Sequence, residues 1–413
     1  MCGIVGYIGN KKVIPILLNG LKRLEYRGYD SAGIAIIENG KIELQKAKGK
    51  ISILENLLSS KDYSSTRGIA HTRWATHGEP NSLNAHPHTD CTGKLAVVHN
   101  GIIENYKVLR EYLQNRDHDF HTDTDTEIIA HLIEDFLRIE GTDLGEAILL
   151  ALQQLEGTYG LAIIHEDYPD KIYAARHGSP LIIGIGKDEN FIASDASAIL
   201  RYTDRVIYLE EQELATIKAD SFEVINMQKK PVETHVSTIE WDLHLIEKDG
   251  FPHFMLKEIF EQPTTMKNAY RGRLNIEEGT VRLNGLKKYL EELKDVKRII
   301  IAACGTSWHS ALIGEYLIEE LARIPVEVEY ASEFRYRSPI LDDGTAVFVI
   351  SQSGETADTL AGLREAKQKG SPVFGIVNSV GSTIARETDA GVYTHAGPEI
   401  GVASTKAFTS QVM

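Results

Sequence analysis

The sequence has few cysteines, and their placement limits what they can do. Only three occur in 413 residues, at Cys2, Cys91 and Cys304, and no two of them form a C-x-x-C pair. This spacing indicates neither a disulfide framework nor a zinc site, and a reducing compartment fits it best.

Long apolar runs and a secretory leader are also missing. No stretch of about 18 consecutive apolar residues occurs, and no basic segment followed by an apolar one opens the chain. We therefore expect a cytoplasmic protein that does not span a membrane. Basic residues are in deficit, with 44 Lys and Arg against 59 Asp and Glu and a net charge of -15. This balance excludes non-specific binding to nucleic acid or to an anionic membrane surface.

Length and composition indicate a folded chain of more than one domain. A hydrophobic content of 42% and a charged content of 25% are ordinary for a globular protein. At about 100–200 residues per domain, 413 residues predict two or three domains. We place the first at residues 1–240, a linker and helical connection at 241–284, and the last at 285–413.

The two large domains differ in how strands and helices follow one another. Residues 1–240 contain apolar residues at helical spacing (13–24, 51–58, 106–114, 126–139 and 144–154) and many short strands that do not alternate with them. This order predicts packed antiparallel sheets with helices outside. Helical spacing also occurs at 254–270 and 286–293. From residue 296, strand and helix alternate, which predicts a doubly wound parallel sheet.

The first residues carry the chain's most reactive group. Once Met1 is removed, the thiol and a free α-amine belong to one residue, Cys2, so the nucleophile has its own base. The alternative is that Cys2 is a small apolar residue at the start of a buried strand.

Three further polar segments suit the binding of an amino-acid amide. Asn100 and Gly101 close a strand and could offer two donors to an oxyanion; alternatively they form an ordinary Asn-Gly turn. Arg73 suits capture of a carboxylate, and Asp123 or Asp125 could hold an ammonium group. A solvated arginine and helix caps before residue 126 are the alternatives.

Five histidines lie in this region, at positions 71, 77, 86, 88 and 99, and invite a metal interpretation. No H-E-x-x-H motif and no Cys/His ligand spacing is present. We therefore expect no metal and no other cofactor.

Taken together, five ordered segments resemble the class II glutamine amidotransferase domain of the N-terminal-nucleophile fold. They are residues 1–6, 24–33, 71–78, 99–105 and 124–127, and the resemblance covers about residues 2–240. It implies an αββα sandwich in which Cys2 is the nucleophile and Asn100 and Gly101 form the oxyanion hole. It also implies a set of glutamine-binding residues: Arg27, Arg73, Trp74, Thr76, His77, Gly78 and Asp125.

In the last domain, two strands run into hydroxyl-rich turns that each open a helix. Such turns bind phosphate through backbone N–H groups without a basic side chain, although plain helix capping is the alternative. With residues 402–406 they resemble a sugar isomerase (SIS) domain. The resemblance implies a sugar-phosphate site formed by Cys304, Gly305, Thr306, Ser307, Ser351, Gln352, Ser353, Thr356, Val402 and Ser404.

The combination of these two domains resembles the glucosamine-6-phosphate synthase family, which uses glutamine and fructose 6-phosphate. Members of that family have a second SIS domain, and this chain ends at Met413, so we expect the isomerising groups to be missing. By analogy with SIS domains we expect a homodimer or a higher homo-oligomer. The alternatives are another class II amidotransferase, for example one acting on phosphoribosyl pyrophosphate, and a sugar-phosphate-binding regulatory module.

Overall fold

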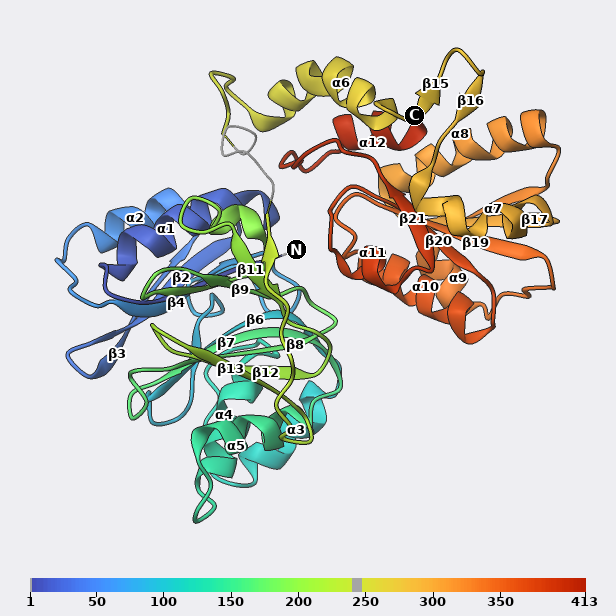
Figure 1. Cartoon of the computed structure of the whole chain (residues 1–413). Coiled ribbons are helices and arrows are strands. Elements are labelled where there is room, and N and C mark those ends of the chain that lie inside the picture. Colours follow the sequence, from blue (N-terminus) through green and yellow to red (C-terminus); the bar gives the residue numbers. More distant parts are fainter. Residues whose placement is uncertain (1, 240–246) are drawn as a thin grey trace. The chain divides into compact units, whose positions relative to one another are not determined.

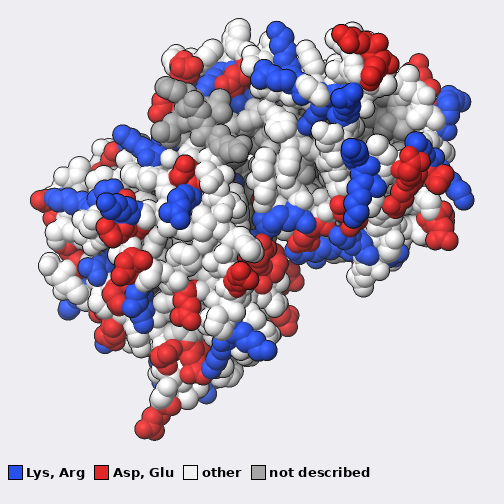
Figure 2. All heavy atoms as spheres, viewed as in Figure 1, with Lys and Arg blue, Asp and Glu red and all other residues white. Residues whose placement is uncertain are grey.

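A computed structural model describes residues 2–239 and 247–413, which fall into two compact units divided after residue 240 (Figure 1). Among the described residues, no helix is both long and apolar enough to cross a membrane. On the first unit, Figure 2 shows basic and acidic side chains interspersed over the visible face.

The first unit contains two antiparallel sheets. The strand order of the larger is β14-β11-β9-β10-β1-β4-β2-β3, and that of the smaller is β13-β12-β8-β7-β6-β5. The larger sheet consists of β1 (Gly3–Ile8), β2 (Ser31–Glu38), β3 (Lys41–Lys48), β4 (Arg67–Arg73), β9 (Ile182–Ile185), β10 (Asn190–Ala193), β11 (Arg205–Tyr208) and β14 (Ser237–Thr238). The smaller consists of β5 (His88–Thr89), β6 (Leu95–Ile103), β7 (Gly157–His165), β8 (Ile172–His177), β12 (Glu213–Ile217) and β13 (Phe222–Asn226).

Alternation along the strands produces two buried layers. In β6, Ala96 and Val98 join the core between the sheets, whereas Leu95 and Val97 pack against helices on the outer face. Successive strand residues point to opposite faces, so this pattern sandwiches the two sheets between helices. The helical segments are α1 (Val13–Leu24), η1 (Glu25–Arg27), α2 (Ile51–Leu58), α3 (Tyr106–Gln114), α4 (Glu127–Leu137), α5 (Leu144–Leu152) and η2 (Ala196–Ala198). The predicted αββα sandwich is confirmed.

The second unit is built on a parallel sheet of order β18-β17-β19-β20-β21. Its strands are β17 (Arg298–Ala303), β18 (Val326–Tyr330), β19 (Thr345–Ser351), β20 (Val373–Val377) and β21 (Ala390–Tyr393). Ile300 and Ala302 pack on one face against α9 and α10, and Ile299 and Ile301 pack on the other with Ala311 of α8. Both faces are therefore covered, which confirms the doubly wound architecture.

The remaining elements of this unit are helices and a short hairpin. They are α6 (Phe254–Tyr270), β15 (Leu274–Asn275), β16 (Thr280–Val281), η4 (Asn284–Tyr289), α7 (Leu290–Lys294), α8 (Gly305–Ala322), α9 (Ala331–Tyr336), α10 (Ala357–Gln368), α11 (Thr383–Glu387) and α12 (Lys406–Val412). The helix expected at 286–293 is thus a 3-10 segment followed by one short α-helix.

Candidate active site

Cys2 lies at the start of β1, beside the end of β4. The antiparallel register pairs Gly3 with Thr72, which places Cys2 beside Arg73, the last residue of β4, and Trp74, which follows it. The Trp74 N–H donates a hydrogen bond to Cys2 Sγ at 3.2 Å, and the thiol faces the Trp74 carbonyl at 3.4 Å. Burial raises the pKa of the Cys2 thiol, and the Trp74 N–H and the Arg73 charge oppose this rise. A thiol in this setting stays protonated until a base removes its proton.

Gly28 fixes the position of the peptide that contacts the thiol. A Cβ at this position would lie 2.6 Å from Arg73 C and 2.7 Å from Trp74 N, closer than any side chain can approach. The Thr72 hydroxyl also donates to the Gly28 carbonyl. Glycine at 28 therefore lets two backbone segments meet directly behind Cys2.

Asn100 and Gly101 lie near the end of β6 and approach Cys2 from the smaller sheet. Asn100 Nδ2 donates to the Cys2 carbonyl at 3.2 Å, while Asn100 Oδ1 lies 3.0 Å from His71 Nε2. Because an imidazole N–H donates and an amide oxygen accepts, His71 fixes which end of the amide faces Cys2. Gly101 has φ 137°, and a Cβ there would lie 2.0 Å from the Thr158 carbonyl oxygen, so only glycine fits.

A group of buried histidines, which we call the histidine network, supports this strand end. It consists of His71, His86, His88 and His99 with the hydroxyls of Thr124 and Thr126 and the carbonyl of Thr158. The backbone N–H of His99 donates to His86 Nδ1 at 3.2 Å. The ring atom His99 Nε2 lies 3.2 Å from the backbone oxygen of Thr158. Thr126 Oγ1 lies 2.9 Å from His99 Nδ1 and 3.4 Å from His86 Nε2.

These contacts are all satisfied when the imidazoles are neutral. The carbonyl of Thr158 requires a proton on His99 Nε2, so the Thr126 hydroxyl donates to His99 Nδ1 and accepts from His86 Nε2. Burial lowers the pKa of all four histidines, that of His71 to about 3. From the sequence, these four histidines were weighed as metal ligands. In the structure they are buried hydrogen-bonding groups.

Arg73 organises the loop that follows β4. Its guanidinium donates to the carbonyls of His77, Gly78 (3.1 Å) and Glu79 (3.5 Å). Within this loop the Trp74 indole is 41% exposed and packs edge-on against Tyr29, and Thr76 is exposed. The loop is thus held from inside by one buried arginine.

Asn84 joins this loop to the segment that contains the predicted ammonium site. It is fully buried, its Nδ2 donates to the Glu79 carbonyl at 3.1 Å, and its Oδ1 accepts from the Asp123 N–H at 3.1 Å. A Cβ at Gly78 would lie 2.8 Å from Asn84 Nδ2. The sequence patterns gave no signal for Asn84, because a loop asparagine has no periodicity to mark it.

Asp125 is buried close to Cys2 and Arg73. Its Oδ2 accepts from the Ile103 N–H at 2.8 Å. Burial lowers the pKa of Arg73, and the nearby Cys2 and Asp125 oppose this lowering. Within the described part of the chain, the side chain of Thr126, the N-cap residue of α4, makes no capping hydrogen bond. The structure therefore brings together Cys2, Arg73, Trp74, Asn100 and Asp125.

Arg27 forms an ion pair within the first unit. Its Nη2 lies 2.6 Å from Asp195 Oδ2, and both side chains are largely buried. Asp195 also accepts from the Ser197 N–H at 2.9 Å and so caps η2. In this conformation Arg27 ties the segment before Gly28 to the 195–198 turn.

In the second unit, the turn after β19 folds around its own hydroxyls. Ser351 Oγ accepts from the Gly354 N–H at 3.0 Å and lies 3.1 Å from Thr356 Oγ1, and Ser353 Oγ accepts from the Glu355 N–H at 3.1 Å. Gly354 has φ 67°, and a Cβ there would lie 1.9 Å from Ser382 Oγ. These bonds shape a tight loop at the carboxyl end of a central parallel strand, where ligands bind in doubly wound sheets.

The turn after β17 lies on the neighbouring strand. Cys304 Sγ is within 3.7 Å of Thr359 Oγ1 on α10, and Ser307 Oγ accepts from Gln411 Nε2 at 3.0 Å. Gly305 and Thr306 open α8. Val402 is exposed and Ser404 half-buried in the segment that leads to α12. The predicted phosphate turns are thus adjacent, and Gln352 follows directly after β19.

Comparison with known proteins agrees with both folds. A family profile described as a glutamine amidotransferase domain matches residues 71–201, and one described as a SIS domain matches residues 292–413. The fold and these matches define the class: a glutamine amidotransferase domain followed by a SIS domain.

Relatives over the whole chain identify the family. The glutamine–fructose-6-phosphate aminotransferase (isomerizing) of Chlorobaculum tepidum is 56% identical over 417 residues, which is all of this chain and 68% of that protein. The enzyme of the same name from Bacteroides thetaiotaomicron is 55% identical, and the chain covers 67% of it. The chain belongs to the glutamine–fructose-6-phosphate aminotransferase (isomerizing) family and spans about two thirds of the length of these relatives.

A solved structure with a related fold has a different named activity. The glutamine phosphoribosylpyrophosphate amidotransferase from B. subtilis aligns with 100% of this chain and 92% of its own, with a TM-score of 0.50 and 20% identity. At that identity the likeness concerns the fold alone.

Proposed function

We propose that Cys2 attacks the side-chain amide of glutamine and releases ammonia. The observation that carries this proposal is the meeting of the Cys2 thiol, the Asn100 amide and the Arg73 and Asp125 charges at the start of β1. The α-amine of Cys2, free once Met1 is removed, takes the thiol proton. Asn100 Nδ2 and the Gly101 N–H then stabilise the oxyanion that forms on the amide oxygen. The protonated α-amine returns the proton to the amide nitrogen as the C–N bond breaks, so ammonia leaves and a thioester forms on Cys2. Water then hydrolyses the thioester, which releases glutamate and regenerates the thiol.

Arg73 and Asp125 hold the α-carboxylate and the α-ammonium group of glutamine in this proposal. A guanidinium has five N–H groups, so Arg73 can keep its bonds to the 77–79 carbonyls while it binds a carboxylate. Trp74, Thr76, His77 and Gly78 form the cover over the bound amino acid, and Arg27 supports the site through Asp195.

In the reaction of the whole family enzyme, this ammonia is transferred to fructose 6-phosphate and yields glucosamine 6-phosphate; to the present chain we assign the glutaminase half and a sugar-phosphate site. We assign the phosphate to the turns after β17 and β19, where the hydroxyls of Ser351, Ser353 and Thr356 and the backbone N–H groups of short turns are concentrated. Thr306, Ser307, Gln352, Val402 and Ser404 complete the assigned site. The family membership and the activity for which the relatives are named support this substrate.

The glutaminase half is tested by mass spectrometry and by glutamate release. We expect the purified chain to lack Met1, to release glutamate from glutamine without a sugar, and to be labelled on Cys2 by a glutamine analogue that carries an electrophile. A chain that retains Met1 yet releases glutamate at full rate contradicts the assigned base.

The sugar half is tested separately by calorimetric titration with fructose 6-phosphate. We expect Ser351→Ala to weaken binding and Ser371→Ala, at a half-buried position between α10 and β20, to leave it unchanged. Equal affinity in Ser351→Ala and the unaltered chain would remove this turn from the phosphate site.

Self-association remains a prediction from the resemblance. Four apolar side chains on α8 are substantially exposed, and a second copy of the chain would cover them: Ile313, Tyr316, Leu317 and Leu321. Light scattering on Leu321→Glu and on the unaltered chain measures whether the oligomeric state depends on this helix.

A further inference from the structure

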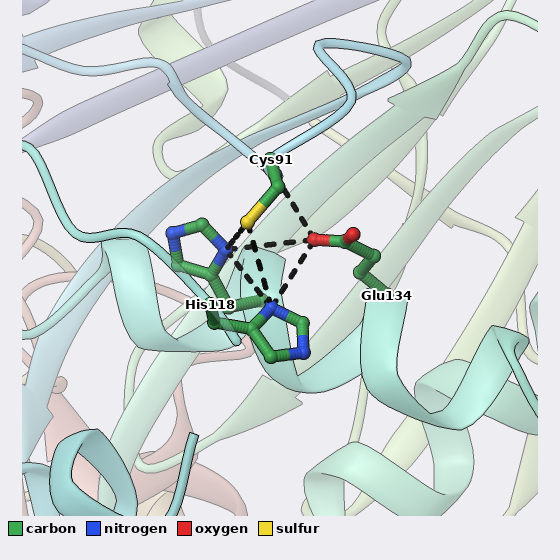
Figure 3. Close-up of side chains that lie close together, drawn as sticks. Cys91, His118 and Glu134 are labelled. Atoms are coloured by element: carbon green, nitrogen blue, oxygen red, sulfur yellow. Dashed lines mark hydrogen bonds and ion pairs between the residues drawn. The ribbon is translucent and has the colours of Figure 1, made fainter. Parts of the chain in front are cut away.

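Four side chains in the first unit converge away from Cys2, and the proposed glutaminase mechanism does not use them. Cys91 lies in the turn between β5 and β6, His118 follows α3, and His131 and Glu134 lie one turn apart on α4 (Figure 3). The two histidines and Glu134 are buried, and one potential ligand atom from each of the four residues lies within 4.8 Å of all the others.

The spacing of these atoms matches a tetrahedral zinc site. Zn–N and Zn–O bonds of about 2.0–2.1 Å and a Zn–S bond of about 2.3 Å place tetrahedral ligands roughly 3.3–3.7 Å apart. Cys91 Sγ lies 3.7 Å from His118 Nδ1 and 3.4 Å from His131 Nδ1, and the two Nδ1 atoms are 3.4 Å apart. Glu134 Oε2 lies 3.3 Å from His118 Nδ1 and 3.6 Å from His131 Nδ1. Five of the six distances between the four ligand atoms therefore have the length expected for a tetrahedral site.

The outer nitrogens of both histidines face carboxylates. His118 Nε2 lies 3.5 Å from Asp135 Oδ1, and His131 Nε2 lies 3.6 Å from Glu127 Oε1. A carboxylate at Nε2 favours the tautomer protonated there, which leaves the Nδ1 lone pair free for a metal. Both Nδ1 lone pairs then point at each other and at Cys91 and Glu134, an arrangement that a cation stabilises.

Both oxygens of the Glu134 carboxylate, and the neighbouring Asp135 carboxylate, have further partners in the protein. Glu134 Oε1 lies 2.8 Å from Arg138 Nη2, and Glu134 Oε2 accepts from the Cys91 N–H at 3.0 Å. Asp135 is 2.8 Å from Arg116 Nε. With a thiolate, one ligating carboxylate and two neutral imidazoles, the four ligands carry two negative charges, which a divalent cation balances.

We propose that Cys91, His118, His131 and Glu134 bind one Zn²⁺ ion as a structural site. The mixture of thiolate, imidazole and carboxylate at tetrahedral spacing selects zinc over magnesium or calcium, which take oxygen ligands. Four protein ligands leave no open position for a substrate, so the ion stabilises the fold and performs no chemistry. This proposal departs from our expectation, based on the sequence, that the chain binds no metal.

The site is connected to the predicted ammonium-binding segment through Glu127. The Glu127 carboxylate, which faces His131, accepts from the N–H groups of His121 and Thr122 at 2.8 Å each and from the Thr122 hydroxyl at 2.7 Å. These residues directly precede Asp123 and Asp125. Zinc at His131 therefore holds the start of the segment that carries Asp125.

Metal analysis of the full chain, purified without chelator, tests the proposal. We expect about one zinc ion per chain, and less than roughly a tenth of that in Cys91→Ser and in His118→Gln. The matched controls are Cys304→Ser, in the second unit, and His235→Gln, an exposed histidine, both of which should retain zinc. Full zinc content in Cys91→Ser and His118→Gln would overturn the assignment.

Cobalt substitution keeps the test decisive if a variant does not fold. We expect the chelated chain to regain one Co²⁺ with a thiolate-to-cobalt charge-transfer absorption and a tetrahedral visible spectrum. Chelation should also lower Tm by roughly 10 °C, since a ligand at a thousandfold its Kd contributes several kcal/mol to a unit of this size. A purified chain without zinc that binds neither Zn²⁺ nor Co²⁺ would show that the four side chains form only a hydrogen-bonded cluster.

Discussion

Replacement of Asn100 by alanine tests the proposed oxyanion hole directly. The substitution removes one of the two donors assigned to the oxyanion, and loss of one such donor typically costs about 10²–10³ in turnover, or about 2.7–4 kcal/mol. Since the donor acts chiefly in the transition state, kcat should fall by that factor while KM for glutamine changes little.

The effect on stability should be much smaller than the effect on turnover. Asn100→Ala removes the bond from Nδ2 to the Cys2 carbonyl, worth about 1 kcal/mol. His71 Nε2 keeps the His99 carbonyl at 3.0 Å, so no buried donor is left without a partner. A loss of about 1 kcal/mol in a unit of this size lowers Tm by roughly 2–4 °C.

Asn105→Ala is the matched control. Asn105 Nδ2 donates to the Gln154 carbonyl at 2.8 Å and its Oδ1 accepts from the Glu156 N–H at 3.1 Å, outside the Cys2 site. This variant should lose at least as much stability as Asn100→Ala and keep its kcat. Initial rates of glutamate release over a range of glutamine concentrations, with thermal unfolding in parallel, measure both quantities. A kcat loss below tenfold in Asn100→Ala, or a loss that lies in KM, would refute the oxyanion assignment.

Three further perturbations test other parts of the site. Cys2→Ala should abolish glutamate release without unfolding the chain, and activity above a tenth of the original would place the nucleophile elsewhere. Asn84→Ala removes the bridge between the Glu79 carbonyl and the Asp123 N–H, so KM for glutamine should rise about tenfold with a smaller change in kcat; an unchanged KM contradicts the bridging role. The histidine network makes stability depend on pH: its folded-state pKa values lie below the unfolded value near 6.5, so only the unfolded chain takes up these protons. The free energy of unfolding should therefore fall as pH drops below about 6.5 towards the folded pKa, about 3 for His71, by about 1.4 kcal/mol per pH unit for each histidine. Urea unfolding between about pH 5 and pH 7.5 measures this slope, and a flat profile would contradict it.

Much of the fold could be predicted from local patterns. The helices at 13–24, 51–58, 106–114 and 254–270 begin and end where the apolar spacing predicts. The spacing did not separate η4 from α7, which follow one another without a break. Strand β13 (Phe222–Asn226) was not distinguished, since as an edge strand it buries only Val224 fully.

The site was predictable where motifs carry it and not where tertiary contacts assemble it. Cys2, Arg73, Asn100 and Asp125 lie in motifs, and the structure brings them close together. Asn84 and Thr126 depend on segments that meet only in the folded chain. The zinc ligands come from three separate segments, and only His131 and Glu134, at helical spacing on α4, left a local trace.

The backbone of Trp74 lies inside the site, whereas its side chain reaches the surface. Its N–H contacts the thiol and Gly28 lies close against its nitrogen, whereas the side chain is 41% exposed. A hinge just after this nitrogen would let residues 75–79 swing outward without disturbing Cys2. This movement would break the hydrogen bonds from Arg73 to the carbonyls of residues 77–79. The guanidinium assigned to the glutamine carboxylate therefore also keeps the loop closed. Loop closure and amino-acid binding would then be thermodynamically linked through one side chain, and each would strengthen or weaken the other by the same factor.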